Sequence, residues 1–138
     1  MNKSILTEDL GKLILRLLVG SLLLFHGTAK LMNGTDGIGK MLAAKGIPEF
    51  IAYGALVGEI LAPVLLILGF CTRAASLLIA FTMFMTVHLA LGKSAFTLTA
   101  SGAPGGEVNF FYFFTAFAIL FLGPGRFSAY RGKKWFLK

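Results

Sequence analysis

Four long apolar runs constrain this chain more than any other feature of its sequence. They cover Leu10–Leu31, Phe50–Phe70, Ala74–Gly92 and Val108–Gly123. A helix of about 20 apolar residues crosses the hydrocarbon core of a bilayer. In lipid, only helices and closed barrels satisfy their own backbone, and barrel strands are alternating segments of about 10 residues. The runs therefore predict an all-α membrane protein, built as a four-transmembrane-helix bundle.

The composition agrees with this fold class. Of the 138 residues, 57% are hydrophobic, whereas soluble domains are about 45–50% apolar. This length predicts a single domain over residues 1–138. The first run has the position of a signal peptide. However, Arg16 interrupts its apolar part, and the residues from Gly27 to Lys30 make a poor cleavage site, so we expect it to be retained as a span.

The connection between the first two runs predicts a short helix over Gly37–Lys45. Thr35 or Asp36 precedes it as an N-cap, and Gly46 and Pro48 follow it as an end signal. Its apolar side chains predict that it lies on the membrane surface, as an interfacial helix between spans 1 and 2.

The basic residues predict the orientation. The net charge is +7, but no RNA- or DNA-binding motif accompanies it, so we expect the lipid bilayer and not nucleic acid as partner. One side of the predicted bundle carries eight Lys and Arg and the other carries four. Lysine and arginine gather on the cytoplasmic side, which predicts a multi-pass protein of the inner (plasma) membrane with both termini cytoplasmic. The richer side holds Lys3, Lys12, Arg73, Arg126, Arg131, Lys133, Lys134 and Lys138, and the poorer side holds Lys30, Lys40, Lys45 and Lys93.

Ionisable residues within or beside the spans are the candidate functional residues. A charge at the centre of a membrane helix costs about 2.5–3.5 kcal/mol on insertion scales, so each is a candidate for ligand binding or proton relay. The candidates are Arg16, His26, Lys30, Glu59, His88 and Glu107. A His–His–Glu metal site is possible in principle, but the spacing does not favour it and we expect no metal. The single cysteine, Cys71, allows no internal disulfide or CxxC redox pair.

Depth along the helices suggests which candidates meet. Counted at 1.5 Å per residue from the cytoplasmic ends of the runs, Arg16 lies ~9 Å deep and Glu59 ~15 Å deep. The two histidines lie at ~24 Å and ~21 Å. We therefore expect Arg16 to pair with Glu59, and His26 to face His88 with the rings within about 10 Å of each other. In the alternative interpretation, the Arg16–Glu59 pair only fixes helix register.

The last run is rich in phenylalanine. Two interpretations stay open for these rings, which are lipid contact with packing, or stacking against a quinone ring. The residues are Phe110, Phe111, Phe113, Phe114, Phe117 and Phe121.

An ordered set of motifs resembles the DoxX family of small four-helix membrane proteins over nearly the whole chain. Glu59 in the second run, His88 at the end of the third and Glu107 before the fourth belong to the same set. The motifs are RLLVG at 16–20, FHGTAKL at 25–31, KGIP at 45–48, LGFCTR at 68–73 and GPGRFS at 123–128.

The resemblance implies a membrane redox helper, because the wider superfamily includes subunits linked to thiosulfate oxidation with quinone as acceptor. We therefore expect a redox-associated subunit that binds quinone or a sulfur oxyanion in a polar pocket of the outer leaflet. Arg16 and Lys30 would supply positive charge, and Glu59 with the histidines would relay protons. A redox-protein subunit and a second copy of the chain are the protein partners compatible with this role. The alternative is a non-enzymatic solute carrier, assembly factor or membrane scaffold, and whether the chain is itself an enzyme stays open.

Overall fold

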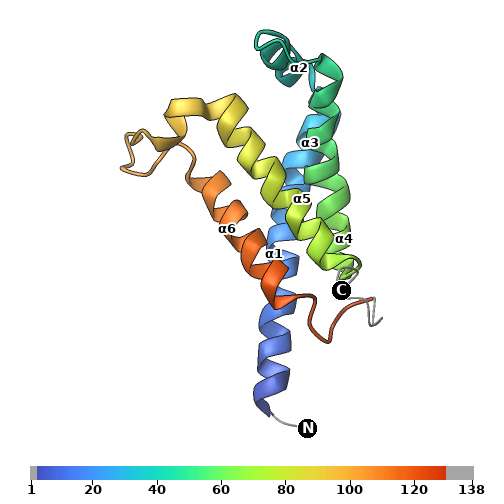
Figure 1. Ribbon diagram of the computed structural model, residues 1–138. Helices are drawn as coiled ribbons and strands as arrows, with labels where there is room; N and C mark the ends of the chain where they lie inside the picture. Colours follow the sequence, from blue (N-terminus) through green and yellow to red (C-terminus); the bar gives the residue numbers. More distant parts are fainter. Residues whose placement is uncertain (1–2, 130–138) are drawn as a thin grey trace.

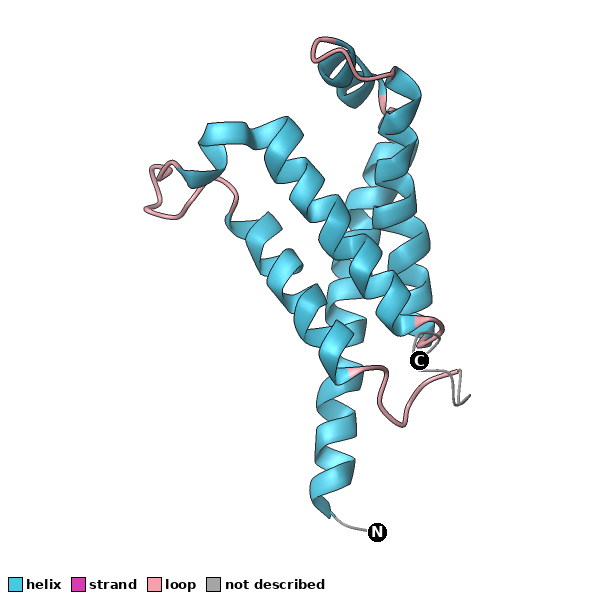
Figure 2. Cartoon of the chain, in the orientation of Figure 1, coloured by secondary structure: helices cyan, strands magenta, loops and turns pink. Residues whose placement is uncertain are grey.

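The computed structural model describes residues 3–129, with side chains from Ile5 onward, and this part of the chain is helical with turns and loops between the helices (Figures 1 and 2). The tail basic residues counted for the orientation, Arg131 to Lys138, lie outside the described residues. The first helix is α1 (Lys3–Asn33), followed by α2 (Asp36–Ala43). The remaining α-helices are α3 (Gly54–Leu56), α4 (Ala62–Leu68), α5 (Thr72–Met85) and α6 (Glu107–Leu122).

Four shorter segments extend these helices. The 3-10 helix η1 (Glu49–Tyr53) precedes α3, and the π-helix η2 (Val57–Leu61) joins α3 to α4. The π-helix η3 (Thr86–Leu91) continues α5 and is followed by the 3-10 helix η4 (Gly92–Phe96). The second and third apolar runs are thus continuous helical rods, each with a π-helical section in it.

Three helical rods are long and apolar enough to cross a membrane. They are Ile5–Asn33, Glu49–Leu68 and Thr72–Phe96, with 29, 20 and 25 residues. The fourth helix, α6, is apolar but has only 16 residues. The prediction of an all-helical membrane protein is confirmed, and its apolar helices make it a multi-pass one. Three of the four predicted spans have the length that a crossing requires.

The rods form a cluster that opens at one end (Figure 1). We call the end that holds Leu68, Thr72 and Leu122 the inner end, after the predicted orientation, and the opposite end the outer end. The α5–α6 arm leans away from α1 and α3 toward the outer end, while the first turns of α1 extend alone past the inner end. Packing is densest between α5 and α6 and between α1 and α4. The buried core contains Val19, Leu23, Ala62, Leu66, Ala75, Ile79, Ala80, Met83, Tyr112, Ala116 and Ile119.

Glycines let the rods approach closely where the second rod passes between the other two. A Cβ atom at Gly27 of α1 would lie 2.3 Å from the carbonyl oxygen of Glu59. On the opposite side, a Cβ atom at Gly58 would lie 1.9 Å from the Thr82 hydroxyl oxygen of α5. Small residues serve membrane helices in this way. The backbone around Glu59 is therefore held between α1 and α5.

The short helix between the first two rods is confirmed. It runs over Asp36–Ala43, whereas the sequence predicted Gly37–Lys45. Thr35 occupies the N-cap position but makes no side-chain capping hydrogen bond. Gly46 has a φ of +73°, the left-handed conformation that glycine adopts without steric cost. The short helix therefore ends before Gly46, as the sequence predicted.

Candidate functional site

A buried ion pair joins α1 to the π-helix η2. The ammonium group of Lys30 donates to Oε1 of Glu59, whose side chain is 3% exposed. The other carboxylate oxygen, Oε2, is buried and has no hydrogen-bond partner among residues 3–129. Buried polar atoms are nearly always paired, so an unpaired one needs an explanation. Short π-helical sections within α-helices occur frequently at functional sites.

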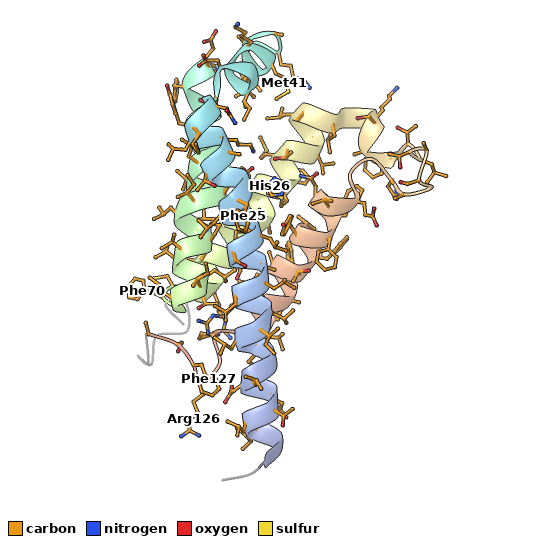
Figure 3. The ribbon with its side chains drawn as sticks, turned by 180° about the vertical axis from the view of Figure 1, so that it is seen from behind. Phe25, His26, Met41, Phe70, Arg126 and Phe127 are labelled. Atoms are coloured by element: carbon orange, nitrogen blue, oxygen red, sulfur yellow. The ribbon has the colours of Figure 1, made fainter. Side chains whose placement is uncertain are left out.

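Tyr112 of α6 and His26 of α1 extend the site around this pair. Tyr112 is 6% exposed, and Gly27, the residue after His26, packs against the backbone of Glu59. The edge of the His26 ring meets the Tyr112 ring at 84°, with 6.2 Å between the ring centroids. Figure 3 shows His26 on the side of α1 that faces α5 and α6. Lys30, Glu59, Tyr112 and His26 thus form one group, which we call the polar cluster.

The sequence did not identify Tyr112 as a candidate, because it lies inside a run of phenylalanines. It is the one tyrosine of that run, and a hydroxyl among apolar rings was the available signal. Asn109 lies one helical turn before it and was also missed. Its side-chain amide donates to the sulfur of Met83 at 3.7 Å. This contact joins the first turn of α6 to α5.

The predicted pairing of Arg16 with Glu59 is wrong. Arg16 is 1% exposed and donates only to backbone carbonyls among the described residues. Nε and Nη2 donate to Leu66 and Ile67 of α4, each at 2.9 Å. Nη1 donates to Pro124 at 2.6 Å and to Phe127 at 2.7 Å. The guanidinium group therefore fastens the end of α4 to the segment after α6.

The error came from the depth count. It placed Leu10 level with the inner end of the other helices, whereas α1 extends several turns beyond them (Figure 1). Arg16 consequently lies beside the last turn of α4, where helix carbonyls lack intrahelical partners and the helix dipole is negative. Arg73 does the same for α6, because its Nε donates to the carbonyl of Leu120 at 2.9 Å. Both arginines hold the inner end together.

The two histidines contact different aromatic rings, and their predicted approach to each other stays a prediction. His88 is exposed and stacks in parallel on Phe84 of its own helix, with 6.1 Å between the ring centroids. Phe84 is itself 54% exposed, so the pair lies on the outer surface of α5 and η3. His26 contacts Tyr112 instead. The structure therefore keeps His26 in the cluster and places His88 apart from it.

Glu107 also lies apart from the polar cluster. It is exposed in the first turn of α6 and lines an open apolar groove along that helix. The groove includes none of the polar-cluster residues; its lining is Leu15, Pro104, Glu107, Phe110, Phe111, Phe114, Thr115 and Ala118. Three of the six predicted candidates, Lys30, Glu59 and His26, thus come together. Within residues 3–129, no three His, Cys, Asp or Glu side chains are grouped as metal ligands would be.

Comparisons with known proteins agree with the motifs. Residues 11–92 match the DoxX family model, a region that includes Arg16, His26, Lys30, Glu59 and His88. A protein of Bacillus subtilis (strain 168) with the name "Putative oxidoreductase CatD" is 31% identical over 96 residues, which are 70% of this chain and 69% of that protein. No solved structure matches the chain. The family match covers more than half of the sequence, and the chain belongs to the DoxX family.

Proposed function

We propose that this protein is a redox-associated subunit of the inner membrane that binds a quinone at the polar cluster. The observation that carries the proposal is Glu59, a carboxylate buried in an apolar rod with one oxygen paired to Lys30 and the other unpaired. Ionisable groups inside membrane helices are expensive and are functional candidates by default. The name of the Bacillus subtilis relative, an oxidoreductase, supports a redox role.

The charges favour a neutral ligand over a sulfur oxyanion. Binding of a sulfur oxyanion would require positive charge from both Arg16 and Lys30. Arg16 lies at the inner end with its donors engaged by four carbonyls, and Lys30 is neutralised by Glu59. An anion brought to the cluster would meet the buried carboxylate without a free cation, which is unfavourable in a low dielectric. A quinone carries no charge and avoids this penalty.

The donors and acceptors of the polar cluster fit a quinone. The partly exposed Lys30 ammonium and the Tyr112 hydroxyl can donate to carbonyl oxygens. Oε1 of Glu59 accepts from Lys30, and Oε2 of the same carboxylate can hold a proton or accept a hydrogen bond. A quinone, when bound, supplies two-electron redox chemistry coupled to protons. The residues of the chain would orient it, exclude water and hold a proton at Glu59.

The binding experiment compares two tyrosines. Tyr112→Phe removes one hydroxyl from the polar cluster, and Tyr53→Phe is the matched control, because Tyr53 is 63% exposed on η1. A net loss of about 1.4 kcal/mol is tenfold in affinity, and one hydrogen bond contributes about 0.5–1.5 kcal/mol. We expect Tyr112→Phe to bind a short-chain quinone in detergent up to about tenfold more weakly than the wild type, and Tyr53→Phe to bind it equally well.

Two outcomes would contradict this function. One is the absence of quinone binding by the purified wild type, checked by native mass spectrometry for copurified quinone. The other is equal quinone affinity in both tyrosine variants. Substrate flux in proteoliposomes without any redox change would instead indicate the carrier alternative.

The orientation belongs to the same proposal, with both termini in the cytoplasm and the polar cluster in the outer half of the membrane. Two single-cysteine variants in a Cys71→Ser background test this orientation. Ile5→Cys lies in the first turn of α1, and Ala44→Cys lies directly after the last residue of α2. Both positions are exposed. We expect a membrane-impermeant thiol reagent added outside to label Ala44→Cys and to leave Ile5→Cys unlabelled until the membrane is permeabilised. The reverse pattern would invert the orientation.

A further inference from the structure

The fourth helix is too short for the membrane that the others cross. Its 16 residues span about 24 Å, against a hydrocarbon core of about 30 Å. Its inner end is level with the start of α5, because Arg73 in the first turn of α5 donates to the carbonyl of Leu120. Its outer end is level with Met83, which Asn109 contacts and which lies about 17 Å along α5 from Thr72. The third rod continues past this level to Phe96.

The segment after η3, residues 92–106, begins with η4, the last five residues of the third rod, and returns to that depth beside the bundle. Figures 1 and 2 show that the chain turns sideways after η3, that the loop stands out from the cluster, and that it then comes back at a lower level to the start of α6. It does not rise above η3 and η4 in these views. Residues 92–106 therefore lie where the outer leaflet surrounds α5.

The backbone of this segment satisfies much of its own hydrogen bonding. Gly105 donates to Thr97 and Gly106 to Ala95, each at 2.9 Å, and Thr99 donates to Ala103 at 2.8 Å. Gly102 donates to Thr99 and Glu107 to Pro104, each at 2.9 Å. Non-helical backbone at membrane depth is tolerated only when its polar groups are satisfied without water. The N–H groups of Thr99, Gly102, Gly105 and Gly106 meet that condition.

Its hydroxyl groups are satisfied in the same way. Ser94 donates to the carbonyl of Leu91 at 2.6 Å, Thr97 to that of Ser94 at 3.1 Å, and Thr99 to that of Ala103 at 2.8 Å. Gly105 is required for the fold of the loop, because a Cβ atom there would lie 2.4 Å from the carbonyl oxygen of Ser94. These three hydroxyl groups thus find their acceptors within residues 91–103.

The two large apolar side chains of the segment face outward, beside exposed hydroxyl groups that bond within the chain. Phe96 and Leu98 are each 71% exposed, and Phe96 meets Phe110 of α6 with 5.4 Å between the ring centroids. Lys93, at the start of the segment, has a stem long enough for its ammonium group to reach the head groups. Glu107 lies on the first turn of α6, where the helix dipole favours a carboxylate.

We propose that residues 92–106 are inserted into the outer leaflet, with Phe96 and Leu98 among the acyl chains, and that they complete the fourth crossing that α6 leaves short. The partner of this surface is lipid, because its large exposed side chains, Phe96 and Leu98, are apolar and its serine and threonine hydroxyl groups are paired within the chain. The insertion stands independently of quinone binding at the polar cluster.

Tryptophan fluorescence tests the insertion. The background is Trp135→Phe, which removes the single tryptophan of the chain. Phe96→Trp and Leu98→Trp are measured in phosphatidylcholine–phosphatidylglycerol vesicles with brominated acyl chains. Phe81→Trp, on a lipid-facing position of α5 that is 59% exposed, gives the embedded reference. Ile5→Trp, on the part of α1 that extends past the inner end, gives the reference outside the bilayer.

We expect Phe96→Trp and Leu98→Trp to show blue-shifted emission and a loss of fluorescence to bromine comparable to that of Phe81→Trp. Emission like that of Ile5→Trp, with quenching by aqueous iodide, would place the loop in water and overturn the proposal. Thermal unfolding identifies any variant that misfolds. If a tryptophan variant misfolds, a nitroxide label on Phe96→Cys in a Cys71→Ser background replaces it. The accessibility of the label to oxygen, relative to a water-soluble nickel complex, then distinguishes lipid from water.

Discussion

Replacing Arg16 by Met is expected to destabilise the protein by about 3–5 kcal/mol. The side chain is 1% exposed and provides hydrogen bonds to four carbonyls. Methionine has a similar volume but no donor, so all four carbonyls would lose the guanidinium, and of the four the Leu66 carbonyl keeps a bond from the backbone N–H of Gly69. An unpaired buried acceptor costs about 1–3 kcal/mol.

Two further variants separate charge from geometry at this position. Arg16→Lys keeps the positive charge beside the end of α4 but lacks the planar guanidinium fork, so we expect partial recovery of stability. Arg126→Gln removes an exposed arginine near the same end and is the matched control, with a small expected effect. The measurement is the midpoint of thermal unfolding in detergent. A wild-type midpoint for Arg16→Met would show that the carbonyl contacts do not hold the inner end.

Elements set by local chemistry could be predicted from the sequence. The apolar runs located the helices, and the fourth run, which ends at Gly123, predicted the end of α6 within one residue. The short helix before Gly46 was found within two residues of its end. Each of these depends on residues close together in the chain. The shortness of α6 could also be predicted, because the fourth apolar run, Val108–Gly123, has the same length of 16 residues as the helix.

The pairing of charges could not be predicted, because it depends on how far each helix is shifted along its axis. The extension of α1 beyond the inner end moved Arg16 away from Glu59 and brought Lys30 level with it. Lys30 had been assigned to the edge of the span. The π-helical turns in η2 and η3 also change the facing of nearby residues, and no sequence signal for them is known to us. Tyr112 became a candidate only once its contacts with His26 were visible.

The Lys30–Glu59 pair is expected to respond unequally to removal of its two members. Glu59 is 3% exposed, whereas the Lys30 side chain is 30% exposed. Lys30→Met leaves a carboxylate buried with neither oxygen paired, which costs about 3–5 kcal/mol when the charge is fully enclosed. Glu59→Gln leaves an ammonium group that can turn toward water on its flexible stem, so we expect a loss of only about 1 kcal/mol.

The double variant Lys30→Met/Glu59→Gln completes the cycle. With no charge left in the pair, it should be more stable than Lys30→Met alone, because the penalty of the unpaired carboxylate is gone. Thermal unfolding in detergent of the wild type, both single variants and the double variant gives the coupling between the two residues. If Lys30→Met and Glu59→Gln lose equal stability and their effects add in the double variant, the pair contributes no coupling. Glu59 would then be neutral in the folded protein, with a proton on one of its oxygens, and the polar cluster would already hold the proton that we propose it exchanges with a bound quinone.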